Sequence, residues 1–320
     1  MSLSRVKMRQ VDPYLTTLMV AYANRPDTFI ANQVLPFLNT GGKRSGRYRK
    51  FTKENFRNYE DKRAPSTMGN KIEFDLDTDG TFKLTDRSLW DGIDDTIRQE
   101  FMGELPVEEI TSRFLVDSRM VAREKRVANL VQSGTYLTNY SALTSNDRWD
   151  VYTSSSSNPK EDIKTMRQSI WAATATKMNT IIMGYQVFDA LQLHPLILES
   201  VKYVMATTNK NMTAELLASY FGVEKVLVGY PLVITTDEGQ SITLAAIWGK
   251  NVIGAHIEPK PTNMTRTLGF TPTTKKGGAG HEMLSYYDND RESQIIKIRA
   301  DESEELVDVE CAYLFNTVIS

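Results

Sequence analysis

Cysteine is almost absent from this chain, which has one, Cys311, in 320 residues. A single cysteine excludes an internal disulfide and a cysteine-based zinc site. The residues around Cys311 alternate between apolar and polar, which predicts a strand in which the thiol is a buried small hydrophobe. Histidine is also scarce, and His194, His256 and His281 are too far apart for a metal-binding spacing. We therefore expect no metal site, no redox role and no cofactor.

Long apolar runs are missing as well. No run approaches the ~18 residues of a membrane span, and residues 1–9 lack the apolar core of a signal peptide. We expect a soluble protein that starts out in the cytoplasm and has no membrane partner. The net charge of -2 also argues against spontaneous binding of nucleic acid, which depends on many Lys and Arg side chains neutralising phosphates.

Recognisable catalytic motifs are not present either. Gly249-Lys250-Asn251 lacks the leading glycine and the Ser or Thr of a phosphate-binding loop, and it is interpreted as a turn between strands. No GxSxG element occurs. We expect no catalytic residues and no enzyme activity. The alternative from a different class is a cytosolic enzyme with its site in residues 160–258, which would require a pocket with convergent polar groups.

One run matches most of a calcium-binding loop. Asp75, Asp77 and Asp79 alternate before Gly80, and Asp86 occupies the twelfth position of an EF-hand pattern. An EF-hand needs flanking helices, whereas the apolar residues here alternate as in strands: Ile72, Phe74, Leu76, Phe82 and Leu84. The acidic face of a β-hairpin is the favoured interpretation, and calcium binding is the alternative.

The segment 43–89 is a charged, extended loop that cannot build a core of its own. Residues 43–63 contain nine Lys or Arg against three acids, net +6. The alternation that follows predicts a β-hairpin with a three-residue turn at Asp79-Gly80-Thr81. An isolated two-stranded hairpin is marginal in water, so we expect a neighbouring subunit to cover it. The candidate interface residues are Arg44, Arg47, Tyr48, Arg49, Lys50, Phe51, Lys53, Phe56 and Phe74.

Charge is distributed unevenly along the chain. Residues 1–63 have a net charge of +8, whereas residues 282–320 have a net charge of -7. Two solvated faces of one monomer would explain this asymmetry. The alternative is electrostatic steering between copies, because complementary fields set register and association rate.

The remainder indicates a long helix and a mixed domain. Apolar residues recur at helical spacing over 107–132, with a charged face that we expect to be solvated or to face a subunit: Glu108, Arg113, Arg119, Arg123 and Lys125. Asn158-Pro159 begins a second helix, and Thr213 and Gly222 delimit a third. Strands alternate with these helices up to residue 257. After a Gly/Pro/Thr-rich connector at 259–280, residues 294–299 and 306–315 are predicted to form a final hairpin.

The order of these elements resembles the major capsid protein of tailed bacteriophages, with the Hong Kong 97-type shell fold that encapsulins share. The resemblance rests on these matching segments: 12–16 and 29–36 in the N-terminal arm, Arg63-Ala64-Pro65 in the loop, the long helix, Trp149, Asn158-Pro159, Asp162-Ile163, His194-Pro195, 216–223 and 247–250. No single segment is diagnostic, but together they run nearly end to end in the right order.

The resemblance implies an α+β Hong Kong 97-like fold with four parts. These are an N-terminal arm (1–42), an extension loop (43–89), a peripheral domain with a spine helix and the terminal strands (90–158 and 282–320) and an axial domain (159–281). It implies a homo-oligomer of pentamers and hexamers that close into an icosahedral shell around double-stranded DNA. An encapsulin-like compartment with enclosed cargo is the alternative within this class.

The resemblance also implies partners and a location. Some relatives carry a scaffolding segment ahead of the arm, and this chain begins directly with the arm, so a separate scaffolding protein is expected. A portal and other virion proteins are further expected partners, and the packaged DNA would make no sequence-specific contacts. The expected location is the virion shell, after assembly in the cytoplasm of a bacterial host.

Overall fold

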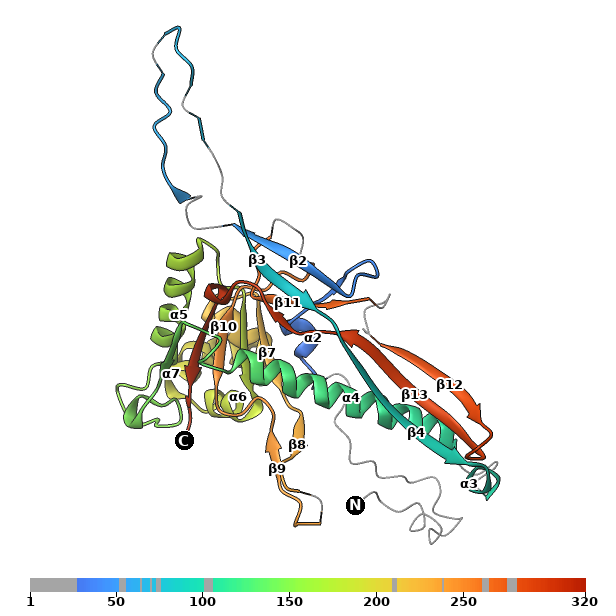
Figure 1. The fold of residues 1–320 in the computed structure, drawn as a ribbon. Coiled ribbons are helices and arrows are strands. Elements are labelled where there is room, and N and C mark those ends of the chain that lie inside the picture. Colours follow the sequence, from blue (N-terminus) through green and yellow to red (C-terminus); the bar gives the residue numbers. More distant parts are fainter. Residues whose placement is uncertain are drawn as a thin grey trace.

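The computed structural model describes residues 28–51, 56–63, 65–69, 71–72, 76–100, 106–208, 212–237, 239–260, 265–274 and 281–320. Two β-sheets and a long helix, α4 (Val107–Val131), form the body, and a two-stranded ribbon extends away from it (Figure 1). Smaller elements are α2 (Ala31–Val34), α3 (Asp95–Glu100) and the hairpin of β8 (Leu232–Ile234) and β9 (Leu244–Ala246).

A five-stranded sheet forms the centre of the body. Its order is β5 (Tyr140–Ala142), β15 (Ala312–Asn316), β10 (Val252–Ala255), β6 (Thr180–Gly184) and β7 (Lys225–Gly229). All five residues of β6 are buried, because both faces of the sheet are covered. Ile181 and Met183 join the apolar cluster of the helices on one face: α5 (Pro159–Thr174), α6 (Tyr185–Gln192), α7 (Pro195–Thr208) and α8 (Ala214–Phe221). Ile182 joins the cluster formed with α2 and α4 on the other face.

Helix boundaries in this region follow the predicted capping residues. The Asn158 side chain accepts a hydrogen bond from the backbone N–H of Glu161, and Pro159 occupies the first turn of α5. Thr213 accepts from the N–H of Leu216 at the start of α8, and Gly222 ends that helix with a φ of 67°. The predicted starts of α5 and α8 and the end of α8 are therefore confirmed.

A second sheet packs beside α4. Its path is β1 (Phe37–Asn39), β11 (Gly269–Thr273), β13 (Ser293–Glu302) and β12 (Glu282–Asp288), with β4 (Thr85–Asp94) also paired to β13 and β14 (Glu305–Leu306) paired to β11. The predicted final hairpin is wrong, because β13 pairs with β4 and β12 whereas β15 belongs to the five-stranded sheet. The predicted connector 259–280 contains β11, a buried strand whose neighbours come from distant parts of the chain.

The predicted turn at Asp79-Gly80-Thr81 is also wrong. Strand β3 (Leu76–Lys83) continues through it and pairs antiparallel with β2 (Ser45–Phe51), with a shift of register between Tyr48 and Lys50. Gly80 is the register partner of Tyr48, and a Cβ on Gly80 would lie 2.3 Å from Tyr48 Cε2. The glycine therefore makes room for an aromatic ring across the ribbon, which is the other common role of glycine in a strand. Asp77 lies in the same extended strand, and this geometry contradicts the calcium-loop alternative.

Helix α4 matches the predicted 107–132 closely, but its buried face differs. Phe114, one of the apolar residues at helical spacing, is 66% exposed, whereas Arg119 and Arg123, expected at a solvated or subunit-facing surface, are buried within the chain. Arginines reach the interior only when other groups of the fold pair with them. Their partners are part of the candidate site.

Candidate subunit interface

The ribbon of β2 and β3 is attached to the body through contacts at its base. Arg44 forms an ion pair of 3.2 Å with Asp301. Tyr48 donates a hydrogen bond of 3.4 Å to the carbonyl oxygen of Leu306 and packs edge-on against the ring of Phe270, 5.7 Å between centroids. These contacts fix the direction in which the ribbon leaves the second sheet.

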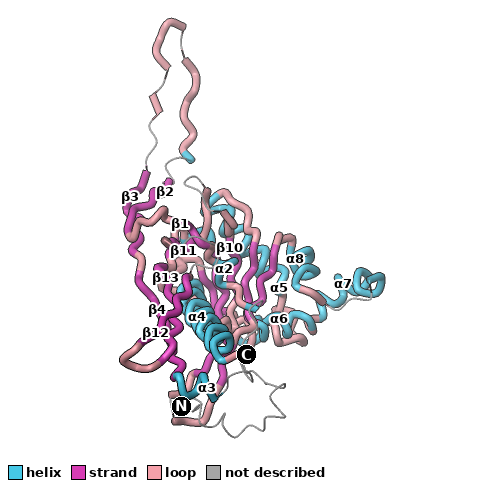
Figure 2. Tube along the Cα trace, turned by 90° about the vertical axis from the view of Figure 1, so that its right-hand side faces the viewer, coloured by secondary structure: helices cyan, strands magenta, loops and turns pink. Residues whose placement is uncertain are grey.

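Beyond the base, the loop that connects β2 and β3 extends from the body as a long projection (Figures 1 and 2). Every residue whose burial is described in 56–63, 65–69 and 71–72 is exposed. Among them are the large apolar side chains Phe56, Tyr59, Met68 and Ile72, and Met68 is 96% exposed. Apolar side chains presented in this way on a projection are typical of an interaction surface.

The nine candidate interface residues have different structural settings. Arg44 and Tyr48 make the contacts at the base of the ribbon, and the side chain of Arg47 is exposed. The ring of Phe56 lies near the body, with its centre 5.5 Å from the guanidinium of Arg266. Arg49, Lys50 and Phe51 belong to β2, but the structure does not describe their side chains. Lys53 and Phe74 lie outside the described residues. The predicted role of all nine at a subunit interface stays a prediction.

A cluster of charged side chains at the base of the ribbon was not predicted from the sequence. Glu302 of β13 is fully buried and accepts from Arg119 at 2.6 Å and from Arg126 at 2.7 Å. Arg126 also pairs with Glu304 at 2.8 Å. This ion cluster, formed by Arg119, Arg126, Glu302 and Glu304, connects α4 to the end of β13. Its carboxylates and guanidiniums are far apart in sequence, which is why residue spacing gave no sign of it.

Two adjacent residues of α4 bind the first described segment of the chain. The carboxylate of Glu124 accepts from the backbone N–H groups of Ile30 and Ala31, at 3.0 and 2.9 Å, and from Trp248 Nε1 at 2.6 Å. Burial raises the pKa of Glu124, and these hydrogen bonds oppose the shift. Burial lowers the pKa of Arg123 to about 10, and its guanidinium donates to the carbonyl oxygen of Leu35 at 3.0 Å. The arm segment is thereby fixed to the helix.

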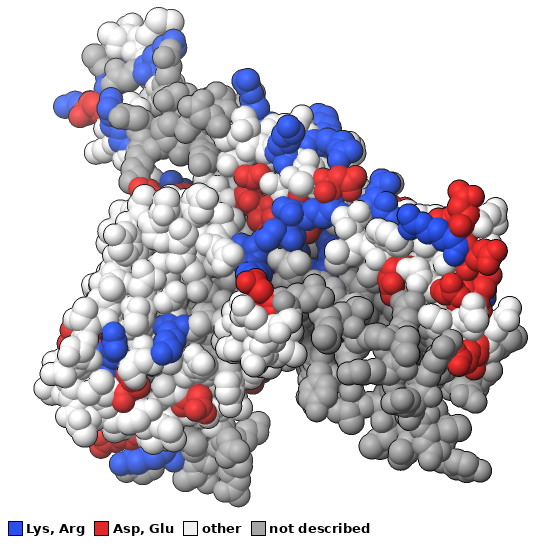
Figure 3. Space-filling model, turned by 60° about the horizontal axis from the view of Figure 1, so that its bottom comes forward, with Lys and Arg blue, Asp and Glu red and all other residues white. Residues whose placement is uncertain are grey.

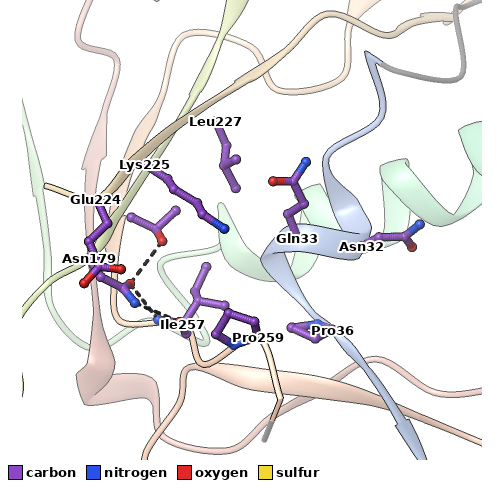
Figure 4. Close-up of a pocket in the computed structure, with 10 residues that line it drawn as sticks. Asn32, Gln33, Pro36, Asn179, Glu224, Lys225, Leu227, Ile257 and Pro259 are labelled. Carbon is purple, nitrogen blue, oxygen red and sulfur yellow. Dashed lines mark hydrogen bonds between the residues drawn. The ribbon is translucent and has the colours of Figure 1, made fainter. Parts of the chain in front are cut away.

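A cavity of about 160 Å³ lies between the arm and the five-stranded sheet, within the region of the alternative enzyme site. Figure 4 shows the Lys225 side chain extending toward Gln33 across this space. The amide of Asn179, one of the residues that line the cavity, donates to the carbonyl oxygen of Ile257 at 2.8 Å and accepts from the Ile257 N–H at 2.9 Å. Asn179 therefore joins the start of β6 to the end of β10.

Among the residues that the structure describes, no three His, Cys, Asp or Glu side chains lie close enough together to hold a metal ion. Within these residues there is also no helix with the length and apolarity needed to cross a membrane. Cys311 is buried beside β15 at the end of a short 3₁₀ turn, not within a strand as expected, and burial raises the pKa of its thiol.

The surface charge has two poles. Figure 3 shows a group of acidic side chains at the right-hand end of the view and basic side chains on the projecting loop at the upper left, with both kinds interleaved between them. The acidic pole comprises Asp94, Asp95, Asp288, Asp290 and Glu292, and the N–H of Asp95 donates to the carbonyl oxygen of Glu292 at 3.1 Å. Steering between copies by these charges stays a prediction, and one of the complementary pairs, Arg44 with Asp301, forms within the chain.

Comparisons with known proteins find one curated relative and many solved structures of similar fold. No family model matches the chain. The chain is 28% identical to the major capsid protein of Burkholderia phage BcepMu over an aligned stretch of 263 residues. This stretch covers 82% of this chain and 81% of that protein.

Solved structures share the fold at lower identity. A phage-related protein from Bordetella bronchiseptica RB50 matches 96% of this chain and 97% of its own, with a TM-score of 0.71 and 21% identity. The capsid structure of cyanophage P-SCSP1u matches 97% of this chain and 93% of its own, with a TM-score of 0.59 and 8% identity. The mature capsid of bacteriophage PhiM1 matches 93% of this chain and 90% of its own, with a TM-score of 0.56 and 10% identity. The chain therefore has the Hong Kong 97-type shell fold, and its predicted resemblance to the major capsid proteins of tailed bacteriophages is confirmed.

Proposed function

We propose that this chain is the structural subunit of an icosahedral viral capsid and that copies of it assemble into pentamers and hexamers. The observation that carries the proposal is the ribbon and its loop, exposed and projecting from a body that has the fold of capsid subunits. A closed shell requires each subunit to present several different complementary patches. The projecting loop and the two charge poles supply such patches.

We assign a separate role to each of the four predicted parts. The arm (1–42) and the extension loop (43–89) make contacts between subunits, while the axial domain (159–281) surrounds the capsomer axis. The peripheral domain (90–158 and 282–320) contains α4. The final strand β15 nevertheless pairs with β10 of the axial range, so the two domains share one sheet. A shared sheet supports a rigid body that includes the described part of the arm, so the projecting loop is the part that we expect to adjust during assembly.

The proposed partners follow from the location in a shell. The shell would enclose double-stranded DNA without sequence-specific contacts, which agrees with a net charge near neutral. A separate scaffolding protein, a portal and other virion proteins would complete the particle, and assembly would take place in the cytoplasm of the bacterial host. The role is structural, and we assign no catalytic residue.

Electron microscopy of the purified chain, combined with sedimentation, tests this function. Closed particles or ring-shaped capsomers are expected. A chain that remains a stable, fully ordered monomer at micromolar concentration would contradict the proposal. Particles that enclose a protein cargo instead of DNA when isolated from infected cells would favour the encapsulin-like alternative.

A further inference from the structure

Strand β12 forms one edge of the second sheet. Among the described residues its only strand partner is β13, and β4 lies on the far side of β13 (Figure 1). The first six of its seven residues are exposed. The backbone groups along the outer side of such a strand are a template on which another strand can pair.

The sequence of β12 does not protect this edge. Edge strands of soluble proteins usually contain a lysine, a proline or a bulge that prevents further pairing. Residues 282–288 include neither lysine nor proline, and their pairing with β13 continues through all seven residues without a shift of register. The edge is therefore suited to accept a further strand.

Charge selects a basic strand for this edge. β12 begins with Glu282 and ends with Asp288, and it contains no basic residue. Two β12 strands placed side by side would oppose acid to acid in the parallel and in the antiparallel direction, and like charges directly opposite each other are destabilising. A second copy of β12 is thus a poor partner, whereas a strand with alternating cations is a good one.

Residues 5–11 have the pattern of such a strand. Basic and apolar side chains alternate, so that Val6 and Met8 share one face. The opposite face carries the three cations Arg5, Lys7 and Arg9. The segment has seven residues, the length of β12, and Asp12-Pro13 follows it, where the proline ends the pattern.

The arm enters the body beside the start of β12. Phe29 of the arm and His281, the residue before β12, line the same small cavity. Residues 12–28 connect the basic segment to this point and span up to about 56 Å when fully extended. Because β12 is only about 23 Å long, the whole edge is within reach of the arm of the same chain.

We propose that residues 5–11 pair with the outer edge of β12 in the same chain, as a further strand of the second sheet. Main-chain hydrogen bonds supply the attachment, as in other cases of strand addition to an open edge. The added strand closes the edge against pairing with other proteins. This inference goes beyond the proposed function, because it concerns how the start of the arm is anchored within one subunit.

The matched lengths define the register. When all seven residues pair, Met8 lies opposite Ser285 whether the added strand runs parallel or antiparallel to β12. Arg5 lies opposite an acid in both cases, Glu282 in the parallel and Asp288 in the antiparallel arrangement. Opposite charges at such positions stabilise a strand pair.

A cross-link between two cysteines of one chain tests this pairing. The purified chain with Met8→Cys and Ser285→Cys is treated with a short bis-maleimide and analysed by denaturing electrophoresis and mass spectrometry. A link between positions 8 and 285 is expected within a single chain. The native Cys311 is buried, so it contributes little background.

A control for this cross-link lies in the same row of the sheet. Ile296 pairs with Ser285 on one side and with Asp91 of β4 on the other. Position 91 is therefore two strands, or about 10 Å, farther from the proposed strand than position 285. Met8→Cys combined with Asp91→Cys should give far less of the link.

The outcomes separate this inference from the proposed function. Absence of the link in a chain whose circular dichroism is unchanged, or equal yields with the control, would overturn the pairing. A link found only in covalent dimers would also overturn it, because the strand would then come from another copy. The capsid function does not depend on these results and fails only if the unsubstituted chain forms no particles.

Proline substitutions give a second measurement. Neighbouring residues of a strand point their N–H groups to opposite sides, so Val6→Pro with Lys7→Pro removes a donor to β12 in either register. The rate of cross-linking between positions 8 and 285 should fall by roughly tenfold or more. Ser2→Pro with Leu3→Pro, outside the proposed strand, is the control and should leave the rate unchanged. Equal rates for the two proline pairs would contradict pairing through the backbone.

Discussion

Strands β6 and β3 show two ways in which one chain uses a β-strand. β6 has hydrogen-bonded neighbours on both sides, and all five of its residues are buried between layers of helices. β3 has β2 as its partner in a two-stranded sheet, and the loop beyond it is exposed. An isolated two-stranded ribbon is marginal in water, whereas a central strand with both faces covered is not. Stability within the subunit is therefore concentrated in the body, and we expect the ribbon to be stabilised further by contacts with other copies.

The ion cluster marks the boundary between these regions. It joins α4 to the end of β13, while Arg44 at the start of the ribbon pairs with the adjacent Asp301. Substitutions on the two sides of this boundary should therefore separate folding from assembly.

The largest loss of folding stability is expected from Glu302→Ala. This change leaves the guanidiniums of Arg119 and Arg126 without their buried carboxylate, and breaking a buried pair costs about 3–5 kcal/mol. Urea denaturation monitored by circular dichroism measures the loss. Arg113→Ala, which breaks an exposed pair with Glu109 at 2.6 Å, is the control and should cost under about 0.5 kcal/mol. Equal losses for the two variants would show that the cluster is not a stability element.

A smaller effect is expected at the base of the ribbon. Gly80→Ala places a Cβ 2.3 Å from Tyr48 Cε2, so the ring must move away from Phe270, and we expect a cost of about 1–3 kcal/mol. Gly69→Ala is the matched control, because a Cβ there would have no neighbour within 4 Å. Thermal unfolding of both variants compares them. A melting temperature unchanged by Gly80→Ala would mean that the Tyr48 contact adds nothing to the body.

Reversing three charges on β2 should leave folding almost unchanged. Arg47→Glu, Arg49→Glu and Lys50→Glu together reverse the charge of β2, where Arg47 is exposed, and surface charge pairs contribute only about 0–1 kcal/mol. Assembly, followed by light scattering, should become slower and lose much of its dependence on salt concentration. Kinetics identical to those of the unsubstituted chain at every salt concentration would exclude steering by this strand.

The smallest effect on folding is expected from removing the projecting loop. Phe51 and Leu76 are register partners, so residues 52–75 can be replaced by an Asn-Gly turn that closes a short hairpin. The free energy of unfolding should stay within about 0.5 kcal/mol, as for surface changes away from the core. Assembly should fail. Global unfolding of this variant would mean that the loop is internal structure.

Local signals in the sequence identified much of the body. Asn158, Pro159, Thr213 and Gly222 act within one turn of the helices that they delimit, so their effect is readable from neighbouring residues. The length of α4 and the buried strands β6, β7 and β10 follow from equally local patterns of apolar residues.

The errors arose where distant partners decide the structure. Arg119 of α4 is buried because Glu302, far along the chain, neutralises it, and no spacing along the helix indicates that pairing. Asp79-Gly80 has the sequence of a turn, but the ring of Tyr48 on the opposite strand requires a glycine there. Strands β4 and β13 likewise form a pair although about two hundred residues of the chain separate them. The candidate interface residues were chosen from charge and apolar pattern; Arg44 and Tyr48 make contacts within the chain, and a role of the nine between copies stays a prediction.

Sedimentation of the purified chain beside the loop-replaced variant, with electron microscopy of the fractions, tests the central claim most directly. The account predicts closed shells or capsomers for the unsubstituted chain and a folded, smaller species for the variant. Two species that sediment alike as folded monomers would contradict the claim that the ribbon and its loop exist to join copies into a shell.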